Sequence, residues 1–269
     1  MSNVEAAEEQ EKVWLGLLLA AIAGGVDALG FLVLLGVFTS HLTGNSTHAS
    51  IDLSQGHWSA LLQTAFPIPL FVFGVMLGAA LTQAGIRHRR PRTLSLVLLL
   101  EAALLLGGLL YGASLTRNGR LDVPVGWRYY LLLALPPVAM GMQNVSVRRA
   151  SGRAIHTTYI TGALTSAAES AVLYLFWLAD QTRSDGRQGL RRALRTSRQQ
   201  RPFDQLVFHS ALWMAYVLGA LFAGVLERCW QVRAFALPLA GLAAAVIWSL
   251  CRPIDGLPPS LGENDATQR

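Results

Sequence analysis

Two short phrases of hydroxyl, amide and glycine residues each follow a polar residue that interrupts a long apolar run. The first, Thr39-Ser40-His41-Leu42-Thr43-Gly44-Asn45, comes after Gly25-Val26-Asp27. The second, Thr157-Thr158-Tyr159-Ile160-Thr161-Gly162, comes after Gly141-Met142-Gln143-Asn144. Threonine can cap a helix, glycine permits close backbone approach, and free helix N–H groups favour an anion or a carbonyl oxygen. The phrases therefore predict a site for a small polar or anionic solute. The predicted binding residues are Asp27, Thr39, His41, Thr43, Gly44, Asn45, Gln143, Asn144, Thr157, Thr158, Thr161 and Gly162.

Two carboxylates are the predicted proton- or ion-coupling residues. Asp27 lies in the middle of an apolar run with small residues on its helical face, and a carboxylate inside a membrane is functional by default. The alternative for Asp27 is a hydrogen-bonded structural carboxylate. Glu169 falls eight residues after Thr161 and so on nearly the same helical face. Its alternative is an ion pair with a cytoplasmic arginine.

Other polar residues receive a structural interpretation. Gln143 and Asn144 could read a solute or join two helices. Glu101 and His209 lie near predicted cytoplasmic helix ends, where long side chains reach the headgroups. The histidines show no paired metal-ligand spacing, and no nucleophile elbow, Walker loop or dinucleotide fingerprint occurs. The sequence therefore predicts no catalytic residue, metal or cofactor.

These residues must be positioned by helices that cross a membrane. The chain is 52% hydrophobic and 14% charged, about half the charged fraction of a soluble domain. Its apolar residues gather in runs that can each cross the hydrocarbon core as a helix. The chain is therefore predicted to be an all-α integral membrane protein with about six transmembrane helices. The runs are Trp14–Phe38, Leu61–Ala84, Leu94–Leu115, Tyr129–Val147, Leu206–Leu226 and Ala234–Leu250.

The recurring phrases divide the chain into two related three-helix units. Because each unit has an odd number of spans, the second must be inverted, and each carries a short discontinuous or re-entrant Thr-Gly segment. Two alternatives stay open: 39–58 as a plain loop, and Thr161–Asp180 as a seventh span. The predicted organisation is an N-terminal tail (1–12), a first repeat (13–115), a linker (116–128), a second repeat (129–251) and a C-terminal tail (252–269).

The arginines predict the orientation. With six spans and both termini in the cytoplasm, the arginine-rich segments after the second and fourth runs and the loop 181–204 all lie inside, as positive-inside topology favours. The segment Arg183–Arg201 is predicted either as an amphipathic helix that binds anionic lipid headgroups or as a solvated loop. Charge placed in short loops between apolar runs argues against a nucleic-acid partner.

The Gly25-Val26-Asp27, His41-Leu42-Thr43-Gly44-Asn45 and Gly141-Met142-Gln143-Asn144 motifs, with the second Thr-Gly phrase, resemble the YoaK family of bacterial membrane proteins, also called domain of unknown function 1275. The resemblance runs from about Val13 to Cys251. It implies a bacterial inner-membrane protein of about six spans and brings no substrate. The arginine-rich insertion Arg183–Arg201 departs from the family pattern.

The leading functional prediction is a transporter or channel for a small solute, with the two Thr-Gly segments near the midplane and Asp27 and Gln143 supporting them. One alternative is an intramembrane enzyme for a lipid-like substrate that uses Asp27, His41 and Glu169 as acid–base groups. Another is a non-catalytic scaffold that docks partners through the arginine loop. The glycine-rich runs could pack within one chain or form a homo-oligomer.

Overall fold

The protein is helical throughout, apart from one small hairpin, in a computed structural model that describes residues 3–90, 92–117, 120–150 and 160–251. Its helices are α1 (Asn3–Val33), α2 (Leu42–Ser54), α3 (Trp58–Ala65), α4 (Pro67–Arg87), α5 (Thr93–Ser114), α6 (Trp127–Ala150), α7 (Ile160–Thr196), α8 (Arg201–Trp230) and α9 (Ala236–Cys251). The 3-10 turns η1 (Ser197–Gln199) and η2 (Gln231–Phe235) precede α8 and α9. Strands β1 (Thr116–Arg117) and β2 (Arg120–Leu121) pair antiparallel between α5 and α6. The all-α prediction is confirmed.

Five helical stretches in the described residues are long and apolar enough to cross a membrane. They are Gln10–Val33, Trp58–Arg87, Thr93–Ser114, Ile160–Arg183 and Arg201–Cys251, the last of which contains α8, η2 and α9. The predicted run Tyr129–Val147 is helical but does not reach the same apolarity, because α6 carries polar residues such as Gln143 and Asn144. The stretch Ile160–Arg183 covers all of Thr161–Asp180, the segment for which a seventh span was the alternative.

The first predicted run is longer than its helix. It extends to Phe38, whereas α1 ends at Val33. Leu35 and Gly36 adopt left-handed backbone angles (φ 57° and 79°), and the Gly36 N–H bonds to the Phe31 carbonyl, a pattern typical of a helix C-terminus. The chain therefore reverses direction before it reaches Thr39.

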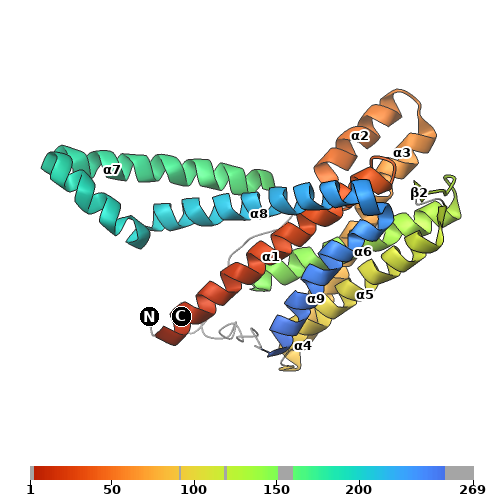
Figure 1. Cartoon of the computed structure of the whole chain (residues 1–269), viewed down its shortest axis with the longest axis horizontal. Helices are drawn as coiled ribbons and strands as arrows, with labels where there is room; N and C mark the ends of the chain where they lie inside the picture. Colours follow the sequence, from red (N-terminus) through yellow and green to blue (C-terminus); the bar gives the residue numbers. More distant parts are fainter. Residues whose placement is uncertain (1–2, 91, 118–119, 151–159, 252–269) are drawn as a thin grey trace, which may run out of the picture.

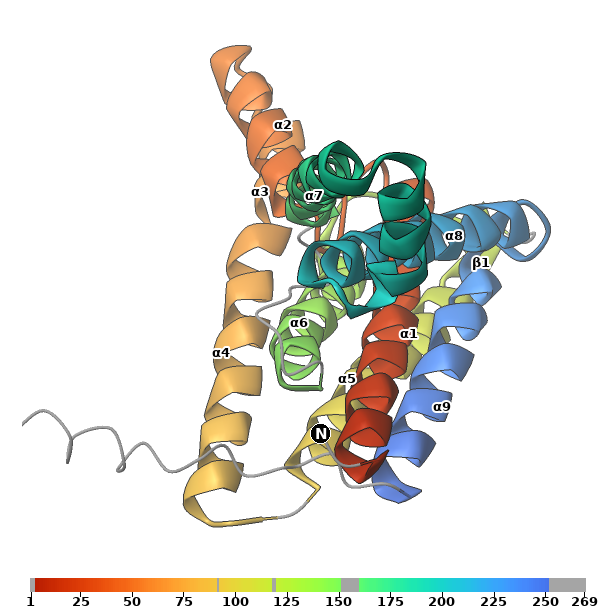
Figure 2. The same cartoon turned by 90° about the vertical axis from the view of Figure 1, so that its left-hand side faces the viewer.

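The helices form a bundle with two projections (Figure 1). Helices α1, α4, α5, α6 and α9 lie side by side, and the two views agree on this arrangement (Figure 2). Helix α7 packs against α8. Helix α7 and the first part of α8 extend away from one side of the bundle, whereas the second part of α8 lies along α1. Helices α2 and α3 form a short hairpin that projects near the end of α1.

Helices α1 and α8 pack through glycines. A Cβ atom on Gly24 would collide with the Tyr216 carbonyl, and one on Gly219 with the Ala21 carbonyl. Leu32 of α1 also reaches α8, further along in the same direction, so the two helices run parallel. Small residues bring helix backbones together where lipid gives apolar side chains no hydrophobic advantage.

Helices α4 and α6 make the same kind of contact. A Cβ atom on Gly74 would collide with the Val138 carbonyl, and one on Gly141 with the Phe71 carbonyl. Each of the four helices contributes one glycine and, three positions before it, the carbonyl group that faces the glycine of the opposing helix. The four pairs are Ala21 and Gly24, Tyr216 and Gly219, Phe71 and Gly74, and Val138 and Gly141. Gly78 contacts Met142 further along, so α4 and α6 are also parallel.

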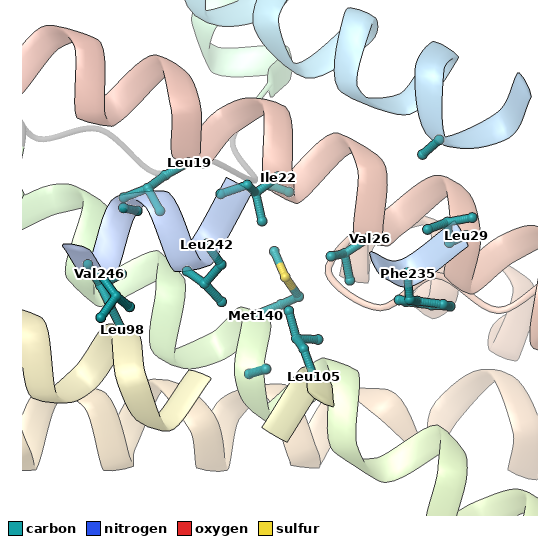
Figure 3. Packing of buried hydrophobic residues seen from close by; sticks show 14 of the residues in the cluster. Leu19, Ile22, Val26, Leu29, Leu98, Leu105, Met140, Phe235, Leu242 and Val246 are labelled. Atoms are coloured by element: carbon teal, nitrogen blue, oxygen red, sulfur yellow. The ribbon is translucent and has the colours of Figure 1, made fainter. Parts of the chain in front are cut away.

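The core lies between α1, α5, α6 and α9 (Figure 3). Leu19, Ile22, Val26 and Leu29 of α1 point toward Leu242 and Val246 of α9, Leu98 and Leu105 of α5, and Met140 of α6. Helix α5 runs antiparallel to α6, since Gly108 lies against Leu135 and Gly112 against Leu132. Helix α9 also runs antiparallel to α5, with Ser95 and Ser249 hydrogen-bonded at 2.7 Å.

The arginine-rich segment is mostly helical, so the prediction of a loop over 181–204 needs correction. Helix α7 continues to Thr196 and changes direction at Gly186 (φ 55°). After this kink it folds back, and the Tyr174 and Ser197 hydroxyls hydrogen-bond at 2.6 Å. Ala193 is buried while Leu194 is exposed. The amphipathic-helix alternative describes this segment better than a loop, because the arginines alternate with buried small residues.

Candidate functional site

The segment Phe38–Ser40 returns alongside α1 after the chain reversal. Thr39 lies so close to Gly30 that a Cβ on this glycine would collide with the Thr39 methyl group. Thr39 and Ser40 are buried, although their backbone is not helical. Non-helical backbone at membrane depth is stable only where protein groups or a water-filled cavity satisfy its polar atoms.

Asp27 satisfies the N–H groups of this segment. Its Oδ1 accepts hydrogen bonds from the Thr39 and Ser40 N–H groups at 3.1 and 2.7 Å and from the Thr39 hydroxyl at 2.8 Å. Its Oδ2 accepts the Ser40 hydroxyl at 2.7 Å and the Tyr216 hydroxyl of α8 at 2.9 Å. The side chain is only 3% exposed. All five bonds have Asp27 as the acceptor, which fills the acceptor capacity of a carboxylate.

Asn45 satisfies Phe38 in the same way. Its Oδ1 accepts the Phe38 N–H at 3.1 Å, and its Nδ2 donates to the Phe38 carbonyl at 2.7 Å. Asn45 is buried in the first turn of α2. Two side chains, one before and one after the segment, therefore hold its backbone in place. We call Asp27, Thr39, Ser40, Asn45 and Tyr216 the Asp27 cluster.

The remaining residues of the first phrase face outward. His41 and Thr43 are exposed, and Gly44 packs against the His41 ring. His41 also meets the Phe38 ring edge-on, with 5.1 Å between ring centroids. Helix α2 begins here without a side-chain cap at His41. The structure thus brings Asp27, Thr39 and Asn45 together and leaves the other predicted residues at the surface of the same segment.

The second phrase is described only in part, because Thr157 and Thr158 lie outside the described residues. Thr161 is exposed in the first turn of α7, and Gly162 is half-buried. The neighbouring Ala163 packs with Ala20 of α1 and with Leu212 of α8. Thr43 and Thr161 therefore begin helices with different partners, since α2 packs on α3 and α4 whereas α7 packs on α8.

Gln143 and Asn144 lie inside α6. Asn144 is half-buried, whereas Gln143 is fully buried. Neither the Oε1 nor the Nε2 atom of Gln143 has a hydrogen-bond partner among the described residues. An amide left in this state costs free energy, so Gln143 has no structural role that hydrogen bonds would explain.

Two carboxylates and two hydroxyls remain, and the structure places them differently from the sequence interpretation. Glu169 is exposed on α7. Glu101 was expected to reach the headgroups, and this interpretation is wrong: its side chain is 0% exposed because α6 and α9 cover its face of α5. Ser40 and Tyr216 were not predicted. Ser40 stood within the first phrase, but no local pattern connects Tyr216 with Asp27, 189 residues away.

Two of the hollows among the described residues are large, and neither is lined by a residue of the Asp27 cluster. One, of about 650 Å³, lies where α5 ends and α8 passes into η2, with Thr116, Gln231 and Arg233 among its lining residues. We call it the α5–α8 hollow. The other is an apolar groove of about 470 Å³ between α1, α8 and α9, which includes Leu18, Gly25 and Gly241. Its lining carries no acid or base.

Long apolar helices, glycine-mediated packing and a buried non-helical segment held by side chains define a multi-pass α-helical membrane protein. The chain belongs to the family described as "Protein of unknown function (DUF1275)", whose model matches residues 15–248. The predicted family resemblance is confirmed.

Two relatives are bacterial membrane proteins. The chain is 27% identical over 160 residues to UPF0700 transmembrane protein YoaK of Bacillus subtilis (strain 168), which covers 60% of this chain and 67% of that protein. It is 32% identical over 143 residues to UPF0700 transmembrane protein RA0705 of Rhizobium meliloti (strain 1021), covering 53% of this chain and 54% of that protein. The chain thus matches about half of the second relative's length. No solved structure matches the chain.

Proposed function

We propose that this protein is a transporter or channel for a small polar or anionic solute in the bacterial inner membrane, with both termini in the cytoplasm. The observation that carries the proposal is the pair of matching glycine contacts, between α1 and α8 and between α4 and α6. We interpret it as an inverted repeat in which α1, α4 and α5 correspond to α6, α8 and α9. Inverted repeats are typical of secondary transporters, whose sites lie near the midplane between the two units.

The packing supports this correspondence. In an inverted repeat the contact of α1 with α8 must recur as a contact of α6 with α4, and equivalent helices must run in opposite directions. Tyr129 at the start of α6 donates a hydrogen bond to the Leu34 carbonyl after α1, at 3.1 Å, so these two helices are antiparallel. When the two glycine contacts are treated as equivalent, Gly24 corresponds to Gly141. Asp27, three residues after Gly24, then corresponds to Asn144, three residues after Gly141. This differs by one residue from the motif alignment, which paired Asp27 with Gln143.

The Asp27 cluster supports a re-entrant first segment. Side chains satisfy its buried backbone, and α2 then leads away with His41 and Thr43 exposed and Gly44 half-buried at its start. We propose that the N–H groups of this first turn and the corresponding turn at Thr161 and Gly162 face the solute path. Helix N-termini of broken helices bind anionic groups in other transporters.

The α5–α8 hollow is the proposed entrance. Arg233 would attract an anion there, and Thr116 and Gln231 supply further polar groups. A membrane enzyme is less well supported, because the apolar groove of α1, α8 and α9 offers no acid or base. We further propose that the arginines of α7 contact anionic lipid headgroups, and that any homo-oligomer uses glycine-rich faces outside the two contacts described.

Reconstitution tests the proposal. Proteoliposomes containing valinomycin, which lets K⁺ accompany an anion, would be shifted into hypertonic potassium formate, acetate or nitrate, or into urea or glycerol. Vesicle reswelling would be followed by stopped-flow light scattering. We expect reswelling to be at least several-fold faster than in protein-free vesicles for at least one solute. Arg233→Gln should slow entry of an anion, whereas Arg228→Gln, an exposed arginine on α8 outside the hollow's lining, should not. Equal rates with and without protein for the whole panel would count against transport of this solute class.

A further inference from the structure

Glu101 is a buried acid that the proposed solute path does not use. Its side chain is 0% exposed, and neither carboxyl oxygen has a hydrogen-bond partner within the described part of the chain. Asp27 is nearly as buried but accepts five hydrogen bonds. The two carboxyl groups therefore differ in chemistry: one is surrounded by donors, the other by none.

Gln143 is the second polar side chain that lacks a partner in this interior. Helices α5 and α6 are antiparallel, with Gly112 against Leu132 and Gly108 against Leu135. Each step back along α5 is therefore matched by a step forward along α6, which brings Glu101 level with Gln143.

The core packing gives the same register. Leu105 points toward Met140 in the same core cluster (Figure 3), and these residues lie one turn from Glu101 and one turn from Gln143 respectively. Glu101 is on the stripe of α5 that carries Leu105 and Gly108, and Gln143 is on the face of α6 that carries Leu132. Both side chains thus occupy facing sides of one helix contact.

Charged groups stand only at the ends of the helices around this level, within the described residues. Between those ends, α4, α6 and α9, which pack against α5, present no acid, base or cation to the middle turns. The titratable or charged residues on these helices and on η2 are Arg87, Arg128, Tyr129, Tyr130, Arg148, Arg149, Arg233 and Cys251. Among the described residues, no charged group therefore stands on the turns of α4, α6 or α9 that are level with Glu101 to neutralise a negative charge.

An ionised carboxylate without a partner is costly in an apolar interior, and such a group becomes neutral instead. We propose that Glu101 holds one exchangeable proton inside the membrane and that Gln143 is its hydrogen-bonding partner. An amide complements a carboxylic acid, since its carbonyl accepts the acid proton while its NH₂ group donates to the acid carbonyl. Rotation of the two side chains toward one another would join two groups that lack hydrogen bonds within the described part of the chain.

A route for the proton leads toward the α5–α8 hollow. A cavity of about 20 Å³, close to the space one water needs, lies between α1, α5, α6 and η2. Leu105 lines this cavity on the side of Glu101, and Val232 lines both the cavity and the hollow. Because the cavity is apolar, a proton could pass only when water enters it. The solute and the proton would then share an entrance.

Infrared spectroscopy of the protein in liposomes tests the protonation directly. At neutral pH we expect the C=O stretching band of an un-ionised carboxyl group, with complete loss of this band in Glu101→Gln. Glu169→Gln, which changes an exposed glutamate, is the matched control and should keep the band. Glutamine has the shape of the protonated acid, so this variant is expected to fold. Glutamate labelled with ¹³C at its carboxyl group should shift the band in the unmutated chain, which makes the assignment independent of any variant.

Exchange of the Glu101 proton is tested with the same C=O stretching band. Transfer into D₂O should shift it, and Gln143→Leu should move it to the frequency of a carboxyl group without a hydrogen-bonding partner. Loss of a carboxylate band, rather than a carboxyl band, in Glu101→Gln would mean that Glu101 is ionised and would overturn the proposal. A band that never shifts in D₂O would overturn exchange. This test does not require solute flux, so its failure and the failure of the proposed transport are distinguishable.

Discussion

At the scale of single residues, Asp27 acts on the chain itself. Its five hydrogen bonds join α1, the Phe38–Ser40 segment and α8. A solute that bound this carboxylate in the same conformation would have to displace one of these donors. The contacts of Asp27 are therefore those of a hydrogen-bonded structural carboxylate, which was the alternative for this residue. A role of Asp27 in proton or ion coupling stays a prediction.

Replacement of Asp27 separates charge from hydrogen bonding. Asp27→Asn keeps one oxygen for the two N–H groups, and its NH₂ group can donate to the Ser40 or Tyr216 hydroxyl, which can rotate. Asp27→Leu leaves buried donors unsatisfied, at a cost of about 1–3 kcal/mol each. We expect thermal unfolding in detergent to show a moderately lower melting temperature for Asp27→Asn and a much lower one for Asp27→Leu. Equal losses would contradict this account.

Tyr216 tests the long-range bond. Tyr216→Phe removes one hydrogen bond to a carboxylate and should cost about 1.5–3 kcal/mol of stability. The control is Tyr130→Phe, because no hydrogen bond of the Tyr130 hydroxyl is found among the described residues and its ring packs on Phe66. A melting temperature of Tyr216→Phe as high as that of the control would show that α8 does not depend on Asp27.

At the scale of helices, the two glycine contacts should be equivalent if the halves are related. Gly219→Ala and Gly74→Ala each drive a methyl group into a carbonyl of the opposing helix. We expect both variants to lose stability, by a similar amount of about 1–3 kcal/mol as for overpacking in a core. Gly107→Ala, where the nearest atom lies 4.0 Å from the added Cβ, is the control. Thermal unfolding of the purified variants measures the difference, and loss at only one glycine would argue against the repeat.

At the scale of the whole molecule, the two cysteines report the orientation. Cys229 lies at the end of α8 and Cys251 at the end of α9, both exposed, and the antiparallel helices α8 and α9 put them at opposite ends of the bundle. With both termini in the cytoplasm, an impermeant maleimide added to spheroplasts should label Cys251→Ser, which keeps Cys229. It should label Cys229→Ser only after permeabilisation. The reverse pattern would invert the proposed topology.

The sequence by itself determined the class of protein, the approximate helices and the position of the polar segment near Asp27. Those features follow from local composition, because long apolar runs must form helices in lipid and a non-helical polar segment needs nearby partners. Asn45 could be expected to act locally, since it is only seven residues from Phe38.

Only the tertiary structure decided which faces are covered. It showed that Tyr216 completes the Asp27 cluster, that α1 ends before Thr39, and that Glu101 is buried rather than at the headgroups. The position of Glu101 along α5 was readable, but its environment depends on α6 and α9, which come later in the chain. A carboxyl group's chemistry is set by its neighbours in space, and these are fixed by the packing of helices rather than by their order.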